Sequence, residues 1–192
     1  MMRKWLFLIL LTFLTACQSG QKQVSFIGTD ITGAEFDAPF TLTDHTGKIR
    51  TMSDFKNKVV VLFFGYTHCP DVCPTTMSDL KQTMKVLGND ADQVQVIFIT
   101  VDPERDTQEV LAKYVPYFDK RFIGLTGSLE QVAKTMGSYK IFSTKVKSAS
   151  TGSYTIDHSA GIYVFDKTGK ARIYMSYGQK PADIAHDIEQ LL

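Results

Sequence analysis

The pattern of hydrophobic and polar residues predicts a mixed α/β domain. Residues 59–64 (VVVLFF) and 94–101 (VQVIFITV) are largely apolar without strict alternation, which is typical of central strands covered on both faces. Between them, apolar residues at helical spacing predict a helix that starts at Pro74 and ends at Gly88. Residues 65–74, which join the first strand to this helix, are expected to form a loop.

Shorter signals predict the remaining elements. We expect an opening hairpin from Phe40 with its turn at 45–48, a helix capped by Asp106, a strand at 122–125, a helix from Ser128 to Met136, a solvated loop at 143–154, a hairpin over 162–177 and a last helix from Pro181. This order predicts a thioredoxin-like α/β fold, a central sheet flanked by helices, with an added N-terminal hairpin and an inserted loop before the C-terminal hairpin. The predicted domain spans residues 38–192.

The first residues predict export and attachment to a membrane. A charged start followed by ten apolar residues, too few to span a bilayer, is typical of a signal peptide, here residues 1–16. Residues 14–17 (LTAC) resemble the lipobox of bacterial lipoproteins, in which the cysteine is lipidated; an ordinary signal peptide followed by an incidental cysteine is the alternative. We expect lipid on Cys17, a tether over residues 17–37, and a domain on the extracytoplasmic face of a bacterial membrane, on the periplasmic side or at the cell surface.

Composition and charge exclude one class of partner. Of the 192 residues, 44% are apolar and 21% charged, which is ordinary for a folded domain. The 21 Lys and Arg residues nearly balance the 20 Asp and Glu residues and form no basic stripe. We therefore expect no nucleic-acid partner.

If Cys17 carries lipid, the cysteines left are Cys69 and Cys73, in the predicted strand-to-helix loop. A structural disulfide is one interpretation, but closing so short a loop removes little entropy from the unfolded chain. A redox-active disulfide is another. Thioredoxin-type sites have two residues between the cysteines, whereas three separate these. Thioredoxins also carry a substrate-docking proline before the C-terminal hairpin, and residues 155–162 contain none; Asp157-His158-Ser159 stands there instead.

Three motifs resemble those of the Sco/SenC family: residues 63–75 (FFGYTHCPDVCPT), 101–107 (VDPERDT) and 157–160 (DHSA). The match runs from about Phe36 to the C-terminus and keeps the order of the motifs. The resemblance implies a membrane-anchored, thioredoxin-like copper protein that helps to deliver copper to the binuclear copper centre of cytochrome c oxidase, with the copper-receiving oxidase subunit as its partner. The family's copper ligands fall on Cys69, Cys73 and His158.

The residue types suit copper on chemical grounds. Thiolates favour Cu(I), and an imidazole lets the same site accept Cu(II). Three protein ligands leave an open position for a recipient's ligand, whereas structural zinc sites close with four. Copper binding and disulfide formation exclude each other, so the site requires an external thiol reductant. The start of the helix is expected to lower the pKa of a nearby thiol.

Three aspartates are candidates for tuning or orienting the ligands: Asp71, Asp102 and Asp157. Turn or capping roles account for them equally well.

Other functions stay open at this point. The cysteine pair is consistent with a thiol:disulfide oxidoreductase that reduces the cysteines of a copper-receiving protein. A peroxiredoxin is disfavoured because no threonine lies three residues before either cysteine, and a structural zinc site lacks its fourth ligand. The favoured function is a metallochaperone, which is a binding protein and needs no catalytic activity.

Overall fold

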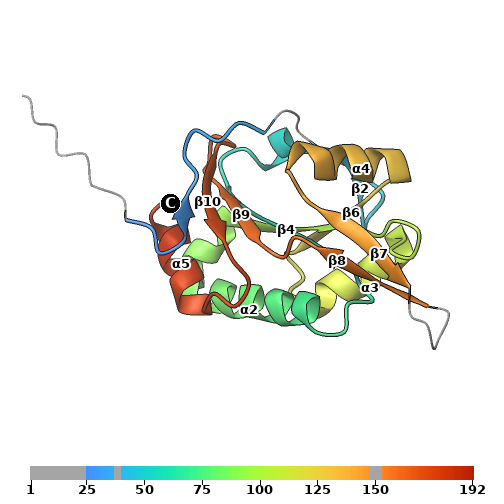
Figure 1. The fold of residues 1–192 in the computed structure, drawn as a ribbon. Coiled ribbons are helices and arrows are strands. Elements are labelled where there is room, and N and C mark those ends of the chain that lie inside the picture. The colour runs from blue at the N-terminus through green and yellow to red at the C-terminus, as the bar shows by residue number, and fades with distance from the viewer. Residues whose placement is uncertain (1–24, 37–39, 148–152) are drawn as a thin grey trace, which may run out of the picture.

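The computed structural model describes residues 25–36, 40–147 and 153–192. The expected signal peptide, Cys17 and the first part of the expected tether lie outside these residues. In the described part, one eight-stranded sheet is covered on both faces, with α2 and α5 along one side and α4 on the other (Figure 1). The predicted thioredoxin-like α/β architecture is confirmed.

The elements have the following bounds. The helices are α2 (Val72–Leu87), α3 (Gln108–Phe118), α4 (Leu129–Ser138) and α5 (Pro181–Glu189), with short 3-10 helices at Met52–Phe55 and Gly88–Gln93. The strands are β1 (Thr29–Asp30), β2 (Thr41–Asp44), β3 (Ile49–Thr51), β4 (Val59–Gly65), β5 (Val94–Thr100), β6 (Ile123–Thr126), β7 (Ser143–Lys147), β8 (Tyr154–His158), β9 (Ile162–Phe165) and β10 (Ala171–Met175). The large sheet has the order β1-β10-β9-β4-β5-β6-β2-β3, in which β5 is parallel to β4 and β6 and the other neighbours are antiparallel.

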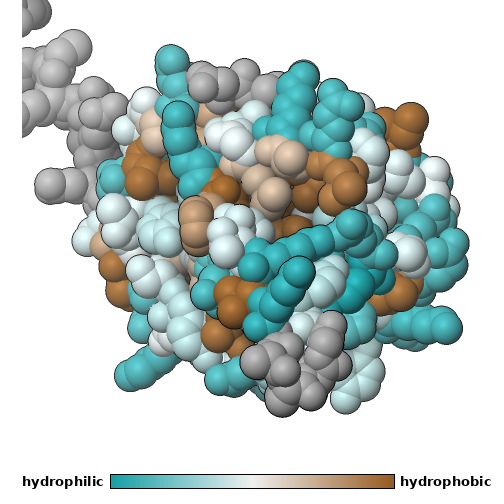
Figure 2. Space-filling model, turned by 45° about the vertical axis from the view of Figure 1, so that its right-hand side comes forward, coloured by the Kyte–Doolittle hydropathy of each residue, from teal (hydrophilic) through white to brown (hydrophobic). Residues whose placement is uncertain are grey.

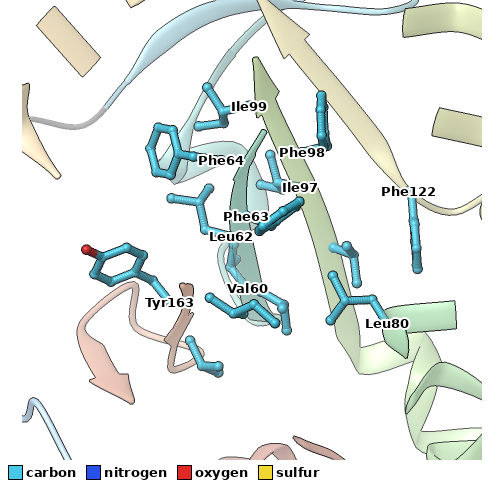
Figure 3. Packing of buried hydrophobic residues seen from close by; sticks show 14 of the residues in the cluster. Val60, Leu62, Phe63, Phe64, Leu80, Ile97, Phe98, Ile99, Phe122 and Tyr163 are labelled. Atoms are coloured by element: carbon cyan, nitrogen blue, oxygen red, sulfur yellow. The ribbon is translucent and has the colours of Figure 1, made fainter. Parts of the chain in front are cut away.

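The core is built around β4 and β5 at the middle of the sheet. Every residue of both strands is buried, as their unbroken apolar runs predict. Figure 3 shows Phe63 on the side of the sheet where Leu80 of α2 lies and Phe64 on the opposite side. Helix α2 buries its predicted apolar stripe and ends at Gly88, whose φ of +55° favours glycine. These contacts hold the end of β4 and the start of α2 together.

The predicted loop at residues 143–154 is wrong. Strands β7 and β8 pair with each other in antiparallel register, from Ser143 opposite His158 to Lys147 opposite Tyr154. Residues 148–152 lie outside the described part. These two strands are exposed along most of their length. Exposed positions favour polar residues, so the segment is rich in Ser, Thr and Lys and has the composition of a loop. The inserted segment is therefore a hairpin, and that hairpin carries His158.

The last part of the expected tether belongs to the folded domain. Strand β1 forms one edge of the sheet and pairs with β10. The amides of Ile27 and Gly28 donate hydrogen bonds of 2.8 and 2.7 Å to the buried carboxylate of Asp187 in α5. Phe26, Ile31 and Phe36 also pack against the core. The packed part of the chain thus begins before residue 37.

Two predicted helix starts differ from the structure. Helix α2 begins at Val72 and not at Pro74, so it includes Cys73. The cap of α3 is Thr107, whose side chain accepts a hydrogen bond from the amide of Val110. Asp106, the predicted cap, is buried and bonds elsewhere. The predicted capping box that begins at Ser128 in front of α4 is confirmed.

Within the described ranges, no helix combines the length and the apolar character needed to cross a membrane. Hydrophilic and hydrophobic residues are interspersed over the face displayed in Figure 2. The most exposed large hydrophobic side chains, Tyr117 (81%), Ile49 (71%) and Phe142 (64%), come from separate parts of the fold.

Candidate functional site

Cys73 lies in the first turn of α2, directly against the end of β4. Its side chain is fully buried. A Cβ placed on Gly65 would lie 3.0 Å from the sulfur of Cys73 and 2.9 Å from the ring of Phe98. The glycine therefore provides the space that the buried sulfur occupies.

His158, at the end of β8, contacts this sulfur from the other side. Its Nε2 lies 3.5 Å from the Sγ of Cys73, although 85 residues separate the two in sequence. Its Nδ1 lies 2.9 Å from the carbonyl oxygen of Ser159. A carbonyl oxygen only accepts hydrogen bonds, so Nδ1 carries the proton and Nε2 presents a lone pair to the sulfur. This is the tautomer in which Nε2 can bind a metal ion.

Burial controls the protonation of both groups. It raises the pKa of Cys73, and the charges of Cys69 and Asp106 add to this increase, so the thiol keeps its proton at neutral pH. The expected lowering of a thiol pKa by the helix start is wrong for Cys73, because desolvation is the largest effect on this thiol and outweighs the hydrogen bond with the backbone of Tyr66, which lowers the pKa. Burial lowers the pKa of His158, against the smaller raising effects of the Ser159 carbonyl and Asp157. The imidazole is therefore neutral at pH 7.

Cys69 is half-buried and lies on the solvent side of Cys73. Its sulfur accepts a 3.5 Å hydrogen bond from the amide of Cys73, and both cysteines are free thiols. Together with Tyr66 and His158, Cys69 lines an open cleft of about 460 Å³, which also includes residues 70–72, 155–157 and Ala160. The cleft gives a ligand access to Cys69 and the imidazole.

The spacing of the donor atoms fits one metal ion in part. If a tetrahedral ion with the bond lengths of zinc were bound by both Cys73 and His158, the Sγ and Nε2 atoms would lie roughly 3.5 Å apart. The structure has this separation. In the described part of the chain, however, no group of three or more His, Cys, Asp or Glu side chains is arranged to hold an ion. A three-ligand site therefore requires the sulfur of Cys69 to move toward this pair.

The three predicted tuning aspartates have different surroundings. Asp102 is buried and accepts a 2.9 Å hydrogen bond from the hydroxyl of Tyr154, at the start of the strand that bears His158. Asp157 is exposed and its charge favours the protonated imidazole of His158. Asp71 is exposed, stands at the N-cap position of α2 and lines the cleft. Of the three, Asp102 makes the contacts expected of an orienting residue.

Asp106 reaches the cysteine loop, a role that the sequence pattern did not single out. Its carboxylate accepts hydrogen bonds from the amide and hydroxyl of Thr67, at 3.0 and 2.6 Å, and from the hydroxyl of Thr100 at 2.7 Å. Thr67 is two residues before Cys69. Burial raises the pKa of Asp106, and the hydrogen bonds from Thr67 and Thr100 oppose that change. The only available signal was its place in the motif at 101–107.

Tyr66 is a second residue that the sequence pattern did not single out. Its hydroxyl accepts a 3.2 Å hydrogen bond from the amide of Ile156 in β8. Its ring meets the ring of His158 edge to face, with centroids 5.8 Å apart. Tyr66 thus connects the cysteine loop to the strand that carries the imidazole.

The fold and this arrangement define a class: a thioredoxin-like protein with two thiols at a strand-to-helix junction, one of which contacts an imidazole from an inserted hairpin. The model of the SCO1/SenC family matches residues 28–192. The chain therefore belongs to the SCO1/SenC family, as its three motifs indicated.

Individual relatives and solved structures agree with this assignment. The mitochondrial SCO2 homologue of Bos taurus is 39% identical over 153 residues, which is 79% of this chain and 58% of that protein. The copper-bound structure of ScoI from Bradyrhizobium japonicum is 41% identical, with a TM-score of 0.76 over 83% of this chain and all of that one. The apo Sco1 structure from Thermus thermophilus is 36% identical, with a TM-score of 0.78 over 89% and 99% of the two chains. The chain thus matches less than two thirds of the length of the bovine relative.

Proposed function

We propose that this chain is a membrane-anchored copper-binding protein that delivers copper during assembly of the binuclear copper centre of cytochrome c oxidase. Copper is its cargo, held by the thiolates of Cys69 and Cys73 and by Nε2 of His158. The observation that carries the proposal is the 3.5 Å contact between the sulfur of Cys73 and Nε2 of His158. Relatives whose structures contain copper, such as the Bradyrhizobium japonicum protein, support the choice of metal.

The chemistry of loading follows from the protonation states. The neutral imidazole presents the lone pair of Nε2, while the thiol of Cys73 carries a proton that must leave when copper binds. The sulfur of Cys69 completes the set from the open cleft. Both Cu(I) and Cu(II) suit a ligand set of two sulfurs and one nitrogen.

Release follows from the shape of the site. The cleft beside Cys69 and His158 is open to solvent, so a ligand from the copper-receiving oxidase subunit can reach the metal while the protein still holds it. Three protein ligands leave room for this extra ligand. A thiol reductant completes the cycle, because a disulfide between Cys69 and Cys73 cannot bind copper.

The location of the protein is part of the proposal. A signal peptide at residues 1–16 and lipid on Cys17 place the domain on the extracytoplasmic face of a bacterial membrane. Strand β1 at Thr29–Asp30 is already part of the sheet, so the domain lies only a short stretch of chain from the anchor. A membrane-bound oxidase is then within reach.

A thiol:disulfide oxidoreductase is the second candidate. The hydrogen bond from the amide of Cys73 to the sulfur of Cys69 brings the two residues close to each other. Cys69 faces the cleft and Cys73 is buried behind it, as in pairs where one exposed thiol attacks first and the other resolves the mixed disulfide. This function needs no imidazole, which separates it from copper delivery.

Replacement of His158 by Ala distinguishes the two functions. In the full chain, copper delivery predicts that Cu(II) affinity falls at least about tenfold, because one of three ligands is lost. It also predicts that the Cys69–Cys73 potential changes little. Both quantities are measured by competition titration with a chelator and by equilibration with a thiol redox buffer.

The matched control is His186→Ala, since that imidazole is 45% exposed on α5 and lies next to Asp187. It should leave both quantities at the parent values. If His158→Ala keeps the parent affinity for Cu(II), copper delivery through this site is wrong and the oxidoreductase is favoured.

A further inference from the structure

The turn formed by residues 102–106, between β5 and α3, contacts both halves of the candidate metal site. The motif at 101–107 contributes no metal ligand to the proposed function, yet most of its polar side chains are buried or half-buried. One side of the turn bonds to the loop that carries the cysteines. The other side bonds to the hairpin that carries His158.

On the cysteine side, Asp106 holds Thr67. The carboxylate accepts both the amide and the hydroxyl of Thr67, and Thr100 bonds to the same carboxylate from β5. Asp106 is fully buried, so these bonds are shielded from water. The backbone two residues before Cys69 is therefore fixed to the turn.

On the hairpin side, Arg105 and Asp102 hold Tyr154. The Nη1 of Arg105 donates a 2.9 Å hydrogen bond to the carbonyl of Tyr154, and the guanidinium lies 3.6 Å from the centroid of the Tyr154 ring. The hydroxyl of Tyr154 donates to Asp102, which also forms an ion pair with Arg105. All three groups therefore bond to one another.

The hairpin requires such support. In the described part of the chain, β7 and β8 pair only with each other and not with the large sheet, and an isolated two-stranded hairpin is marginally stable in water. Tyr154 begins β8 and His158 ends it. A strand fixed at Tyr154 and again at Ile156, through the hydroxyl of Tyr66, presents the imidazole in one orientation.

We propose that the 102–106 turn sets the separation between the sulfur of Cys73 and the imidazole, with Arg105 as the positioning residue for His158. Arg105 acts through Tyr154 and β8 and touches no metal. The proposal rests on the proposed function, because it assigns the turn a role at the same site. It predicts that loosening the contacts between the turn and the hairpin weakens the contribution of the imidazole to Cu(II) affinity and leaves the Cys69–Cys73 potential unchanged.

The first test replaces Tyr154 by Phe, which removes the bond to Asp102 and keeps the ring over Arg105. In the copper-free full chain, we expect amide hydrogen exchange at Ile156 and Ser159, whose amides bond to the hydroxyl of Tyr66 and to the carbonyl of Phe142, to become about tenfold faster. This is the effect of losing one hydrogen bond to a charged group. Cu(II) affinity should fall by a similar factor, while the Cys69–Cys73 potential stays at the parent value. If Tyr154 had only a structural role, its replacement would not change Cu(II) affinity without also changing the Cys69–Cys73 potential.

A second variant, Arg105→Lys, keeps the charge and removes the planar group that bonds to both Asp102 and Tyr154. It should exceed Tyr154→Phe in its effect on hydrogen exchange and on Cu(II) affinity. Tyr117→Phe is the matched control, because that tyrosine is 81% exposed on α3. The control should match the parent in all three measurements.

The outcomes separate this proposal from the proposed function. If both variants keep the parent exchange rates and Cu(II) affinity while His158→Ala loses Cu(II), the positioning role is wrong and copper binding stands. If His158→Ala keeps Cu(II), the proposed function is wrong. Faster hydrogen exchange at Ile156 and Ser159 would then still show that the turn stabilises the hairpin, and unchanged exchange would overturn that role.

Discussion

The sulfur of Cys73 and the Nε2 of His158 lie 3.5 Å apart across 85 residues of sequence. The sulfur comes from the first turn of a helix that packs on the central strand β4, so the main core holds it rigidly. The imidazole comes from a hairpin outside the main sheet. One group of the candidate site is thus part of the core, while the other depends on the contacts that Tyr66 and the 102–106 turn make with the hairpin.

We expect copper affinity to fall as pH falls. Burial raises the pKa of Cys73, so copper must displace a proton from this thiol throughout the neutral range. Each unit of decreasing pH then lowers the apparent affinity about tenfold for each displaced proton. Burial lowers the pKa of His158 from 6.5, so protonation of the imidazole adds to the loss only below that pH.

Competition with a chelator between about pH 6 and pH 8 measures this dependence. In Cys73→Ala the slope of the logarithm of affinity against pH should decrease by about one, since one fewer proton is displaced. An equal slope in parent and variant would show that Cys73 releases no proton when copper binds.

Gly65→Ala should displace the buried sulfur. The added methyl would lie 3.0 Å from the Sγ of Cys73 and 2.9 Å from the ring of Phe98, and both groups are closely packed. We expect a loss of about 1–3 kcal/mol in the free energy of unfolding, together with weaker copper binding. Urea denaturation and chelator competition measure the two effects.

Gly137→Ala is the control for that substitution. Gly137 lies within α4 and a Cβ there meets no atom within 4 Å. Alanine should therefore raise the free energy of unfolding by up to about 1 kcal/mol, because it is the better helix former. Copper affinity should stay at the parent value. If the two variants behaved alike, the close packing around Gly65 would not be what constrains the sulfur.

Asp44→Asn should destabilise the domain at neutral pH and much less in acid. Burial alone would raise the pKa of Asp44, but hydrogen bonds from Thr46, Arg50 and Lys48 lower it far below 3.8. A carboxyl whose folded pKa is depressed adds stability above its unfolded pKa, and that stability is lost as pH falls through the folded value. We expect the free energy of unfolding of Asp44→Asn to be about 1–3 kcal/mol below that of the parent at pH 7. This difference should become smaller below about pH 4.

Urea denaturation of the parent and of Asp44→Asn at several pH values between about 3 and 7 measures this difference. Asp92→Asn is the control, because that side chain is 88% exposed, and its effect should be small at every pH. If the difference in the free energy of unfolding between the parent and Asp44→Asn stayed constant down to about pH 3, the charge of Asp44 would contribute nothing to stability.

The sequence was sufficient for the parts of the fold that depend on hydrophobic pattern. Strands β4 and β5 and the buried face of α2 follow directly from their apolar residues, since each is packed on the main core. The pairing of β7 with β8 did not follow, because an exposed hairpin of Ser, Thr and Lys has no hydrophobic period. Strand β1 was missed because its bonds run from the backbone to β10 and to Asp187, which local sequence does not reveal.

The candidate site was predictable to the extent that its chemistry depends on residue types. The motifs identified Cys69, Cys73 and His158, and the structure brings Cys73 and His158 into contact. The surroundings were not predictable. Whether burial or the helix dipole dominates at Cys73 depends on the depth of the residue, and the link between Asp106 and Thr67 spans 39 residues.

Asp187→Asn should release the N-terminal segment from the domain. The buried carboxylate accepts hydrogen bonds from the amides of Ile27 and Gly28, whereas an asparagine has one oxygen and would turn its NH₂ group toward one of these donors. We expect faster proteolysis within residues 25–36 and a loss of about 1–3 kcal/mol in the free energy of unfolding. Glu189→Gln, exposed on the same helix, should change neither. β1 lies at the edge of the sheet, far along the chain from the cysteines. Cu(II) affinity should therefore stay at the parent value in both variants. A loss of affinity in Asp187→Asn would show that the segment supports the copper site as well.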